Sequence, residues 1–341
     1  MRAVTLKSFG GIENLVVSQV PKPSISHDTD VLIRVKATAV NRADTMQRKG
    51  LYAPPPGVTD IMGLEAAGVV EAVGDKVTAF KPGDRVMCIL AGGGYAEYVI
   101  AHVGCVMHIP QSFDFVKAAA VPEVFLTAWQ CLRMENHIGE GDSVLIHAGA
   151  SGVGTAAAQL VERVLGGVAV TTSSEDKVEL CKQFATHCVS RTPDAENNGK
   201  CFAAKVTQAL GPQHPGVQLV IDPVFGGTYL QEDGEVLAMD GAITVLAFMG
   251  GSTIKGWNAA PFFRKRARVS FSTLRNRTAE YKTALVDSFT KEALPAFETA
   301  ALEGKPALQP VISAVLPFES VAEAQHMVEK NQSVGKVILT L

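Results

Sequence analysis

A glycine-rich turn between an apolar strand and a small-residue helix constrains the fold of this chain more than any other segment. Residues 143–147 read Ser-Val-Leu-Ile-His, which is typical of a buried strand, and Ala148-Gly149-Ala150-Ser151-Gly152-Val153-Gly154 follows directly. Residues 155–165 then continue at helical spacing. A strand, a glycine turn and a helix in this order form a dinucleotide-binding fingerprint.

The chemistry of phosphate binding explains the composition of the turn. A pyrophosphate must approach main-chain N–H groups at the start of the helix, where the helix dipole also favours an anion. Gly149, Gly152 and Gly154 allow this approach and close packing of the helix on the strand. Ser151 stands where the fingerprint usually has its second glycine, and its hydroxyl can donate to a phosphate. We therefore predict nucleotide binding; the alternative is a tight turn without a ligand.

Apolar strands alternate with helical patterns from about residue 118 to residue 272. After the first strand, the candidates are residues 167–172, 219–222, 243–248 and 269–272. This alternation predicts a parallel sheet with helices on both faces. The residues before it contain short β-branched runs between glycines and prolines, which indicates a compact, barrel-like β region. A helical pattern at 319–330 and a last strand at 336–341 follow, and we expect this tail to return to the first region.

The end of the second strand in this alternation decides which dinucleotide would bind. Thr172 and two serines come first, and Lys177 follows one helical turn into the next element. Hydroxyls and a cation suit the 2′-phosphate of NADP, whereas a carboxylate suits the ribose of NAD. We predict Lys177 as a 2′-phosphate ligand, with a solvated surface lysine as the alternative, and Arg191 as a second candidate.

Two acids at the same place complicate this prediction. Glu175 and Asp176 lie between the serines and the lysine. We interpret Ser174 as an N-cap and the acids as first-turn residues, which the helix dipole favours.

Composition excludes several classes of protein. The chain has 341 residues, 47% of them hydrophobic and 19% charged, which excludes a disordered chain and suggests two domains. The net charge of −3 argues against nucleic-acid binding through bulk positive charge. Six scattered cysteines without a C-x-x-C pair argue against a disulfide scaffold and a structural zinc site. With no secretory signal pattern and no run of about 20 apolar residues, we expect a cytoplasmic protein without a membrane partner.

Further motifs connect these residues to a known family. These motifs are Asn41-Arg42-Ala43-Asp44, Gly63-Leu64-Glu65-Ala66-Ala67-Gly68, Gly94-Tyr95-Ala96-Glu97-Tyr98 and Leu126-Thr127-Ala128-Trp129. With them, the chain resembles the zinc-independent, zeta-crystallin-like quinone oxidoreductase branch of the medium-chain dehydrogenase/reductase superfamily. The resemblance extends from the first strand to residues 331–337 and so covers essentially the whole chain.

The resemblance implies an α/β protein with two domains. Residues 1–122 and 290–341 would form a GroES-like β-barrel domain, and residues 123–289 a Rossmann domain with a doubly wound parallel sheet that binds NADPH. It also implies hydride transfer from NADPH to quinones or activated enones. In this family the last Rossmann strand pairs with its counterpart in another subunit. That strand lies near residues 269–272 here, so the resemblance implies a homodimer, with a tetramer as the alternative.

The resemblance also assigns site residues, motif by motif. Asn41, Tyr52 and Thr127 would lie beside the nicotinamide and substrate; the alternatives are a turn-capping Asn41 and a Tyr52 packed on the prolines at 54–56. Ser151, Gly152 and Val153 would meet the pyrophosphate, and Lys177 the 2′-phosphate. The other residues implied along the cofactor are Asp222, Phe248, Met249, Gly250, Ser272, Leu274 and Lys336.

Zinc is not expected in this chain. Zinc-dependent members of the superfamily place a cysteine near Asn41 and a histidine at the position of Leu64. Neither residue present can ligate zinc, which takes histidine, cysteine or carboxylate ligands. A quinone or activated enone can accept hydride directly from a nicotinamide, so the protein would mainly orient the reactants. Water or a nearby hydroxyl would then supply the proton.

Three other features have simpler interpretations. We expect His147 to be buried and hydrogen-bonded rather than a base, and Arg42 to pair with Asp44. A basic cluster is interpreted as a solvated surface or a subunit contact; its members are Arg264, Lys265, Arg266, Arg268, Arg275 and Arg277. If it instead bound nucleic acid, the chain would be a regulatory or RNA-binding NADPH-binding protein with weak reductase activity, which is the alternative function.

Overall fold

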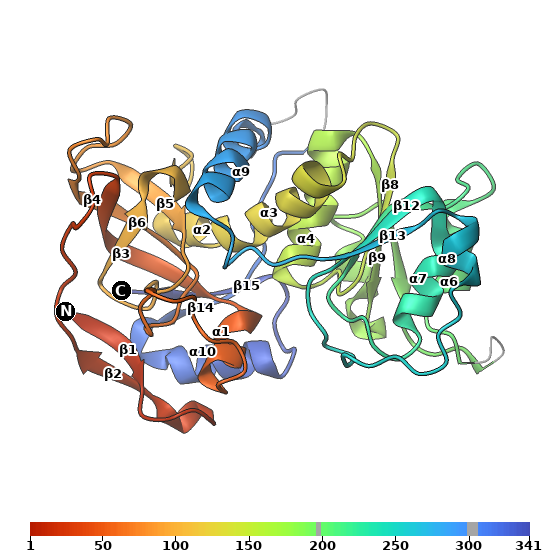
Figure 1. Ribbon diagram of the computed structural model, residues 1–341, viewed down its shortest axis with the longest axis horizontal. Coiled ribbons are helices and arrows are strands. Elements are labelled where there is room, and N and C mark those ends of the chain that lie inside the picture. The colour runs from red at the N-terminus through yellow and green to blue at the C-terminus, as the bar shows by residue number, and fades with distance from the viewer. Residues whose placement is uncertain (196–198, 299–305) are drawn as a thin grey trace. The chain divides into compact units, whose positions relative to one another are not determined.

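The computed structural model describes residues 1–195, 199–298 and 306–341 (Figure 1). These residues form two compact units. Unit 1 comprises residues 1–126, 274–298 and 309–341, and unit 2 comprises residues 127–195, 199–273 and 306–308. The sequence-based boundaries assign residues 123–126 and 274–289 to the central domain, whereas they group with unit 1 here. The cause is α9 (Ala279–Glu292), whose Phe289 packs on the rings of Phe125 and Phe297.

Unit 2 contains a six-stranded sheet in which all neighbouring strands are parallel. The strand order is β10-β9-β8-β11-β12-β13. Counted from β8, this is the 3-2-1-4-5-6 order of a doubly wound dinucleotide-binding sheet, so the Rossmann prediction is confirmed. The strands are β8 (Ser143–Ile146), β9 (Val168–Ser173), β10 (His187–Ser190), β11 (Val217–Asp222), β12 (Leu237–Val245) and β13 (Arg268–Phe271).

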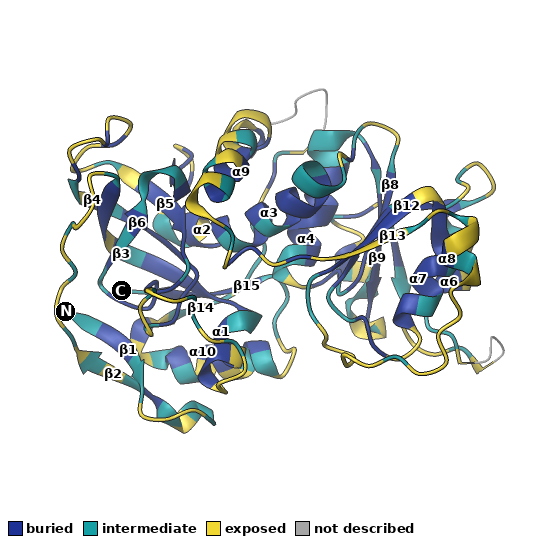
Figure 2. Cartoon of the chain, in the orientation of Figure 1, coloured by how far each residue is buried: buried dark blue, intermediate teal, exposed yellow. Residues whose placement is uncertain are grey.

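The central strands of unit 2 are apolar because helices cover both faces of a parallel sheet. Leu145, Val220 and Ile243 are fully buried and form one core with helix residues such as Val206 and Leu230. Figure 2 shows these central strands in the dark blue of buried residues. The helices are α4 (Gly152–Gln159), α5 (Val178–Cys181), α6 (Ala203–Leu210), α7 (Tyr229–Val236) and α8 (Ala260–Arg264).

Unit 1 is built on a seven-stranded, largely antiparallel sheet of the GroES-like type predicted. The order is β14-β15-β3-β4-β5-β7, and β6 also pairs with β3. Only β14 and β15 are parallel to each other. The strands are β3 (Asp30–Val40), β4 (Glu65–Val73), β5 (Arg85–Ile89), β6 (Tyr98–His102), β7 (Val106–His108), β14 (Ile312–Pro317) and β15 (Lys336–Thr340), with a separate hairpin of β1 (Arg2–Leu6) and β2 (Leu15–Gln19).

The C-terminal tail returns to unit 1, as predicted. Strand β15 pairs antiparallel with β3, so that Val337 lies opposite Val40. The predicted tail helix is α10 (Val321–Glu329), which buries Val321 and Ala324 in the core with Phe318. The other helices are α1 (Arg42–Arg48), α2 (Phe115–Ala119) and α3 (Pro122–Trp129), the last of which ends in unit 2.

None of the helices in the described part of the chain combines the length and the apolar composition needed to cross a membrane.

The basic residues between 264 and 277 do not form one solvated cluster. Arg266 of unit 2 pairs with Asp240, with Nη2 2.5 Å from Oδ2. Arg275 belongs to unit 1 and is buried. Its guanidinium donates to the carbonyl of Ala91 at 2.7 Å and to Oε1 of Gln47 at 2.8 Å. The surface interpretation is therefore wrong for Arg275, because buried acceptors hold its charge.

Candidate functional site

The glycine turn joins β8 to α4 at the carboxyl edge of the unit 2 sheet. A Cβ built on Gly149 would lie 2.6 Å from Cβ of Thr171 on β9, and one built on Gly154 would overlap the carbonyl oxygen of Ala148. Packing thus requires glycine at both positions. The N–H of Gly149 donates to the carbonyl of Thr172 at 2.9 Å, which anchors the turn to β9.

Ser151 is the N-cap of α4. Its backbone is extended, with φ −74° and ψ 168°, and its Oγ accepts the N–H of Gly154 at 3.0 Å. The hydroxyl hydrogen is not used in that bond and stays available to an anion. The first amides of a helix have no intrahelical acceptor, and here Ser151 is exposed while Gly152 and Val153 are half-buried. Small residues, open amides and a hydroxyl donor together fit a pyrophosphate group.

Two cations follow the next two strands of the sheet. Lys177 is half-buried in a short turn whose N-cap is Ser174, as predicted. Arg191 is exposed and follows β10, where its N–H donates to the carbonyl of Ser173 at 2.9 Å. The pKa of Asp176 is lowered by a hydrogen bond from Ser174 and also by the charges of Lys177 and Arg191. Both cations therefore lie near the same point at this edge.

The loops after β11 and β12 bond to each other. The N–H of Met249 donates to the carbonyl of Pro223 at 3.1 Å, and that of Gly250 to the carbonyl of Val224 at 2.9 Å. Phe248 and Met249 are about half exposed, at 49% and 48%. The loops thus present two apolar side chains at the carboxyl edge that also carries the glycine turn.

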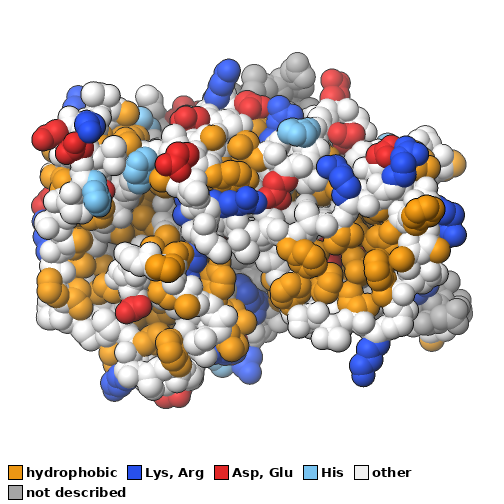
Figure 3. Space-filling view, viewed as in Figure 1, with side chains coloured by type: hydrophobic (Ala, Val, Ile, Leu, Met, Phe, Trp, Pro, Cys, Tyr) orange, Lys and Arg blue, Asp and Glu red, His pale blue; other side chains and the backbone are white. Residues whose placement is uncertain are grey.

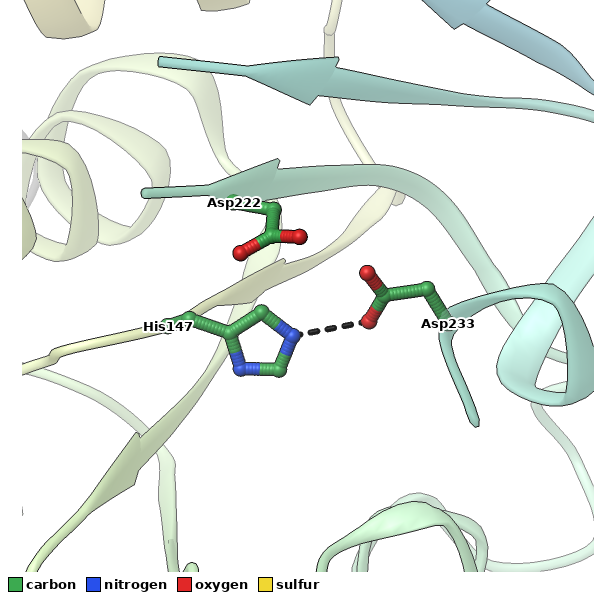
Figure 4. Close-up of side chains that lie close together, drawn as sticks. All are labelled: His147, Asp222 and Asp233. Carbon is green, nitrogen blue, oxygen red and sulfur yellow. Dashed lines mark hydrogen bonds and ion pairs between the residues drawn. The ribbon is translucent and has the colours of Figure 1, made fainter. Parts of the chain in front are cut away.

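Three titratable side chains lie together next to the turn (Figure 4). His147 follows β8, and its Nε2 lies 2.7 Å from Oδ1 of Asp233 on α7. Its Nδ1 lies 2.9 Å from Oγ1 of Thr172. Asp222 ends β11 and accepts two backbone N–H groups of the following loop, at 2.6 and 2.9 Å. His147, Asp222, Asp233 and Thr172 are all fully buried, at 0–1% exposure. Asp222 and Thr172, two of the predicted cofactor residues, therefore point into the protein.

Burial controls the charge of this cluster. It lowers the pKa of His147 to about 4, raises that of Asp222 to about 6, and holds that of Asp233 well above its usual value. Burial thus disfavours the charged form of both groups, and the contact of His147 with Asp233 is a hydrogen bond of a neutral imidazole rather than an ion pair. The prediction of a buried, hydrogen-bonded His147 is confirmed.

The same cluster is the one group, within the described residues, whose ligand atoms are close enough to hold a metal ion, all lying within 4.8 Å of one another. A catalytic zinc needs an open position for water or substrate. His147, Asp222 and Asp233 are closed to solvent, and both ring nitrogens of His147 already have hydrogen-bond partners. These residues therefore do not fit a catalytic zinc.

Unit 1 has its own buried polar cluster around Lys336. The Lys336 Nζ lies 2.8 Å from Oε1 of Glu65 and 2.5 Å from Oδ1 of Asn41. The Asn41 Nδ2 donates to the same Glu65 oxygen at 2.8 Å. Lys336 is 3% exposed and Glu65 0%. The side chains of two predicted site residues, Asn41 and Lys336, are thus bonded to each other and to Glu65.

Asp44 lies in the first turn of α1, and Asn41 is the N-cap residue of that helix. The Asp44 Oδ2 accepts the N–H of Asn41 at 2.7 Å and the hydroxyl of Tyr95 at 2.9 Å, and burial raises the pKa of Asp44 to about 6. The predicted pairing of Arg42 with Asp44 is wrong. Asp44 turns inward to these donors, whereas Arg42 donates to Oδ1 of Asn331 at 2.5 Å.

Tyr52 is half-buried in unit 1 and lies against Arg275. The guanidinium carbon of Arg275 is 5.2 Å from the centre of the Tyr52 ring, which is the distance of a cation–π contact. The Tyr52 hydroxyl makes no hydrogen bond to any described residue. It is therefore open to a ligand.

The remaining predicted residues differ in their surroundings. Thr127 is half-buried on α3, and Leu274 is buried in unit 1. Ser272 is buried in unit 2, where its Oγ donates to Oε1 of Glu135 at 2.6 Å and accepts Nε2 of Gln130 at 2.5 Å. The structure thus gathers the glycine turn, the two cations and the 248–250 loop at one edge of unit 2, while Asn41, Tyr52, Leu274 and Lys336 belong to unit 1.

Sequence reasoning missed the contacts of Glu65 and Arg275. A signal for Glu65 exists, because a charged residue inside the apolar run 64–67 needs a partner if the run is buried. Arg275 is one cation among several in the sequence, and nothing there separates it from its exposed neighbours.

Comparison with known proteins identifies the family. The model of the alcohol dehydrogenase GroES-like domain matches residues 27–111, and that of the zinc-binding dehydrogenases matches residues 185–339. The quinone oxidoreductase of Lama guanicoe is 31% identical over 345 residues, covering 100% of this chain and 98% of that protein. The chain belongs to the quinone oxidoreductase family. This family is a branch of the medium-chain dehydrogenase/reductase superfamily, so the resemblance seen in the motifs is confirmed.

Two solved structures have the same fold as this chain over its whole length. A mycobacterial protein in complex with NADPH is 27% identical, with a TM-score of 0.80 and 100% of both chains covered. An NAD-dependent alcohol dehydrogenase is 29% identical, with a TM-score of 0.79 and the same coverage.

The buried Asp222 makes stability depend on pH in a defined direction. Its pKa rises from 3.8 to about 6 on folding. The stability that it contributes is present below the unfolded value and is lost as pH rises through the folded one. Asp222→Asn should therefore gain stability relative to the original chain between pH 4 and 7, by up to about 3 kcal/mol. Urea unfolding at several pH values measures this gain.

Asp240→Asn is the control, since Asp240 is exposed and its pKa is lowered by a hydrogen bond and charge from Arg266. No gain is expected for it over the same pH range. If the gain in stability of Asp222→Asn did not change with pH, the raised pKa of the buried Asp222 carboxyl would be contradicted.

Proposed function

We propose that the protein is an NADPH-dependent quinone oxidoreductase that transfers hydride to quinones or activated enones without a metal. The observation that carries this proposal is the edge of unit 2 at which an anion-binding turn and two cations converge. Family membership supports the reaction type, and the NADPH complex of the mycobacterial relative supports the cofactor. The likeness to an NAD-dependent relative makes the choice of dinucleotide the point to test.

The residues at this edge of unit 2 suit the two phosphate groups of NADPH, the pyrophosphate and the 2′-phosphate. Ser151, Gly152 and Val153 would hold the pyrophosphate with a hydroxyl and two amides, while Gly149 and Gly154 keep the cradle free of side chains. Lys177 and Arg191 would hold the 2′-phosphate. Charge-assisted contacts of this kind are about twice as strong as neutral ones.

Other residues would shape the rest of the binding surface. The exposed Phe248 and Met249, with Gly250, would line the dinucleotide through apolar and backbone contacts. Several predicted cofactor residues are buried, and we propose that they act by holding the contacting loops in place; they are Thr172, Asp222, Ser272, Leu274 and Lys336.

When bound, the nicotinamide supplies the hydride, and the chain has to orient its partner. We propose Tyr52 as the substrate contact, because its hydroxyl is open and its ring is fixed by Arg275. Asn41 and Thr127 are proposed beside the reacting groups. The side chain of Asn41 is fixed by Lys336 and Glu65, which would hold it in one orientation.

We propose that catalysis needs no zinc, although one matching family model is that of zinc-binding dehydrogenases. Asn41 and Leu64 are not zinc ligands, and the buried group at His147 is closed to solvent. We also propose a cytoplasmic location, because all six cysteines are free thiols, which suit a reducing compartment.

A homodimer through β13 is the proposed assembly. This strand is at the end of the sheet, and all its residues are exposed, with Val269 at 37% and Phe271 at 61%. Phe271 at the end of this strand forms a ring cluster with Phe225 and Phe248. Figure 3 shows hydrophobic side chains gathered on the visible face of unit 2. An exposed apolar edge strand is a template for pairing with another chain.

The activity itself is tested by measuring NADPH consumption with a panel of ortho-quinones and enones. We expect ortho-quinones to accelerate NADPH oxidation over the rate without protein. If no member of the panel does so, the reductase proposal fails.

Lys177→Ala tests the cofactor assignment. Loss of one charge-assisted contact should weaken NADPH binding by about 10- to 100-fold and leave NADH binding nearly unchanged. Titration calorimetry with both dinucleotides measures the ratio. Lys182→Ala is the matched control, since Lys182 pairs with Glu179 on the surface, 2.5 Å away. An unchanged NADPH/NADH ratio in Lys177→Ala would remove Lys177 from the site.

Phe271→Asp tests the dimer. A carboxylate in place of the exposed aromatic ring at the end of β13 should convert the dimer into a monomer at micromolar concentration, as measured by light scattering. Phe9→Asp, at an exposed aromatic of unit 1, should leave the dimer intact. A monomeric mass for the unaltered protein would refute the assembly.

A further inference from the structure

Glu123 is an acid that the reaction outlined above leaves unused. It is the second residue of α3, and its N–H donates to Oε2 of Glu65 at 2.8 Å. The other oxygen of Glu65 is already held by Lys336 and Asn41. Unit 1 therefore contains two neighbouring carboxyl groups, of which Glu65 has a cation and Glu123 does not.

The carboxyl of Glu123 has no fixed partner. Neither of its oxygens makes a hydrogen bond or an ion pair with any residue that the structure describes. The residue is half-buried. Some side-chain oxygens and nitrogens of the described residues are both shut off from solvent and without a hydrogen-bond partner, but the two oxygens of Glu123 are not among them. A general acid needs a carboxyl of this kind, whose proton can be reached and is not committed to a structural bond.

Charges on several elements act on this carboxyl. Enclosure by protein and the negative charge of Glu65 raise the pKa of Glu123 to about 8, with Asp44 adding to the rise and Lys336 and Lys282 opposing it. The carboxyl is protonated at pH 7 and can be reprotonated from water near that pH. Catalytic acids work best when their pKa is near the operating pH.

Glu123 also interacts electrostatically with Tyr52 and Arg275. Burial raises the pKa of Tyr52 and the charge of Glu123 adds to the rise, whereas burial lowers the pKa of Arg275 and the charge of Glu123 is one of those that oppose this. The other candidates for a proton donor in this region are weaker. Burial raises the pKa of Tyr52 above its usual value of 10. Lys282 is committed to the carbonyl of Arg275, to which its Nζ donates at 2.7 Å.

We propose that Glu123 is the proton donor of the reductase reaction, an inference that rests on the proposed function. In the balanced reaction a quinone, NADPH and one proton give a hydroquinone and NADP⁺. The quinone gains the hydride with its electron pair and becomes the hydroquinone monoanion. The charged oxygen then takes the proton of Glu123, whose O–H bond breaks with its electrons left on the carboxylate. Water returns a proton to Glu123 after the product leaves.

The first experiment measures the protonation of Glu123 without any reaction. The carboxyl carbons are followed by ¹³C NMR of protein labelled at glutamate, from pH 5 to 10. We expect one resonance that titrates near pH 8 and is missing in Glu123→Gln. Glu71→Gln, at an exposed residue paired with Lys22, should retain it. If no carboxyl that is lost in Glu123→Gln titrates above pH 6.5, the proposal is overturned.

The second experiment measures kcat against pH with the best quinone. In the unaltered protein kcat should fall tenfold per pH unit above about pH 8, as Glu123 loses its proton. Glu123→Gln should lower kcat by about 10²-fold and remove this limb of the profile, with little change in the Kd of NADPH. Glu71→Gln should keep both the rate and the limb.

Rescue separates proton donation from a structural role. Glu123→Ala should regain activity when small carboxylic acids or imidazolium are added, in proportion to their acid form. Full activity and an unchanged pH profile in Glu123→Gln would overturn the proposal, as would a loss of activity that no added acid rescues in a folded variant. If the unaltered protein reduces no quinone, the proposed function fails, whereas the NMR titration still reports the state of Glu123.

Discussion

The buried ion pair between Lys336 and Glu65 is the contact on which unit 1 depends. It connects β15, near the end of the chain, to β4, and both charges are removed from water. Burying two charges is favourable only with good geometry and further hydrogen bonds, and Asn41 supplies these by donating to Glu65 and accepting from Lys336. Loss of either charge would leave the other buried and uncompensated, at a cost of about 3–5 kcal/mol. The ion pair thus fixes the orientation of Asn41 and joins three segments that are distant in the sequence.

The two units place titratable groups in their interiors by different means. In unit 2, burial lowers the pKa of His147 and raises that of Asp233, so that a hydrogen bond to a neutral imidazole replaces an ion pair. In unit 1, Lys336 and Glu65 form a buried ion pair, with Nζ 2.8 Å from Oε1. Glu123 lies beside that pair without a cation of its own, and the charge of Glu65 favours its protonated form. Burial is the larger cause of the raised pKa of Glu123, and within the ion pair Glu65 raises that pKa while Lys336 lowers it.

Local patterns in the sequence were sufficient to predict most of the fold. The period of the strands and the glycine turn predicted the parallel sheet of unit 2, and the composition of residues 336–341 predicted the return of the tail. Long-range pairings were harder to predict. The sequence suggests that Arg42 pairs with Asp44, but Asp44 instead accepts the hydroxyl of Tyr95, which a separate loop brings to it. Similarly, Arg275 reads as one of several surface cations until its acceptors, Ala91 and Gln47, are seen. Such contacts depend on the completed fold, and no local spacing encodes them.

The pairing of β15 with β3 has a consequence for synthesis of the protein. Domains generally fold as units while the chain emerges from the ribosome. Strand β15 (residues 336–340) pairs with residues 37–40 of β3 and is translated long after them. The sheet of unit 2 has all its strands between residues 143 and 271. Unit 2 can therefore form its sheet before β15 is made, whereas unit 1 must wait for residues 336–340, and Glu65 has no partner until Lys336 is present.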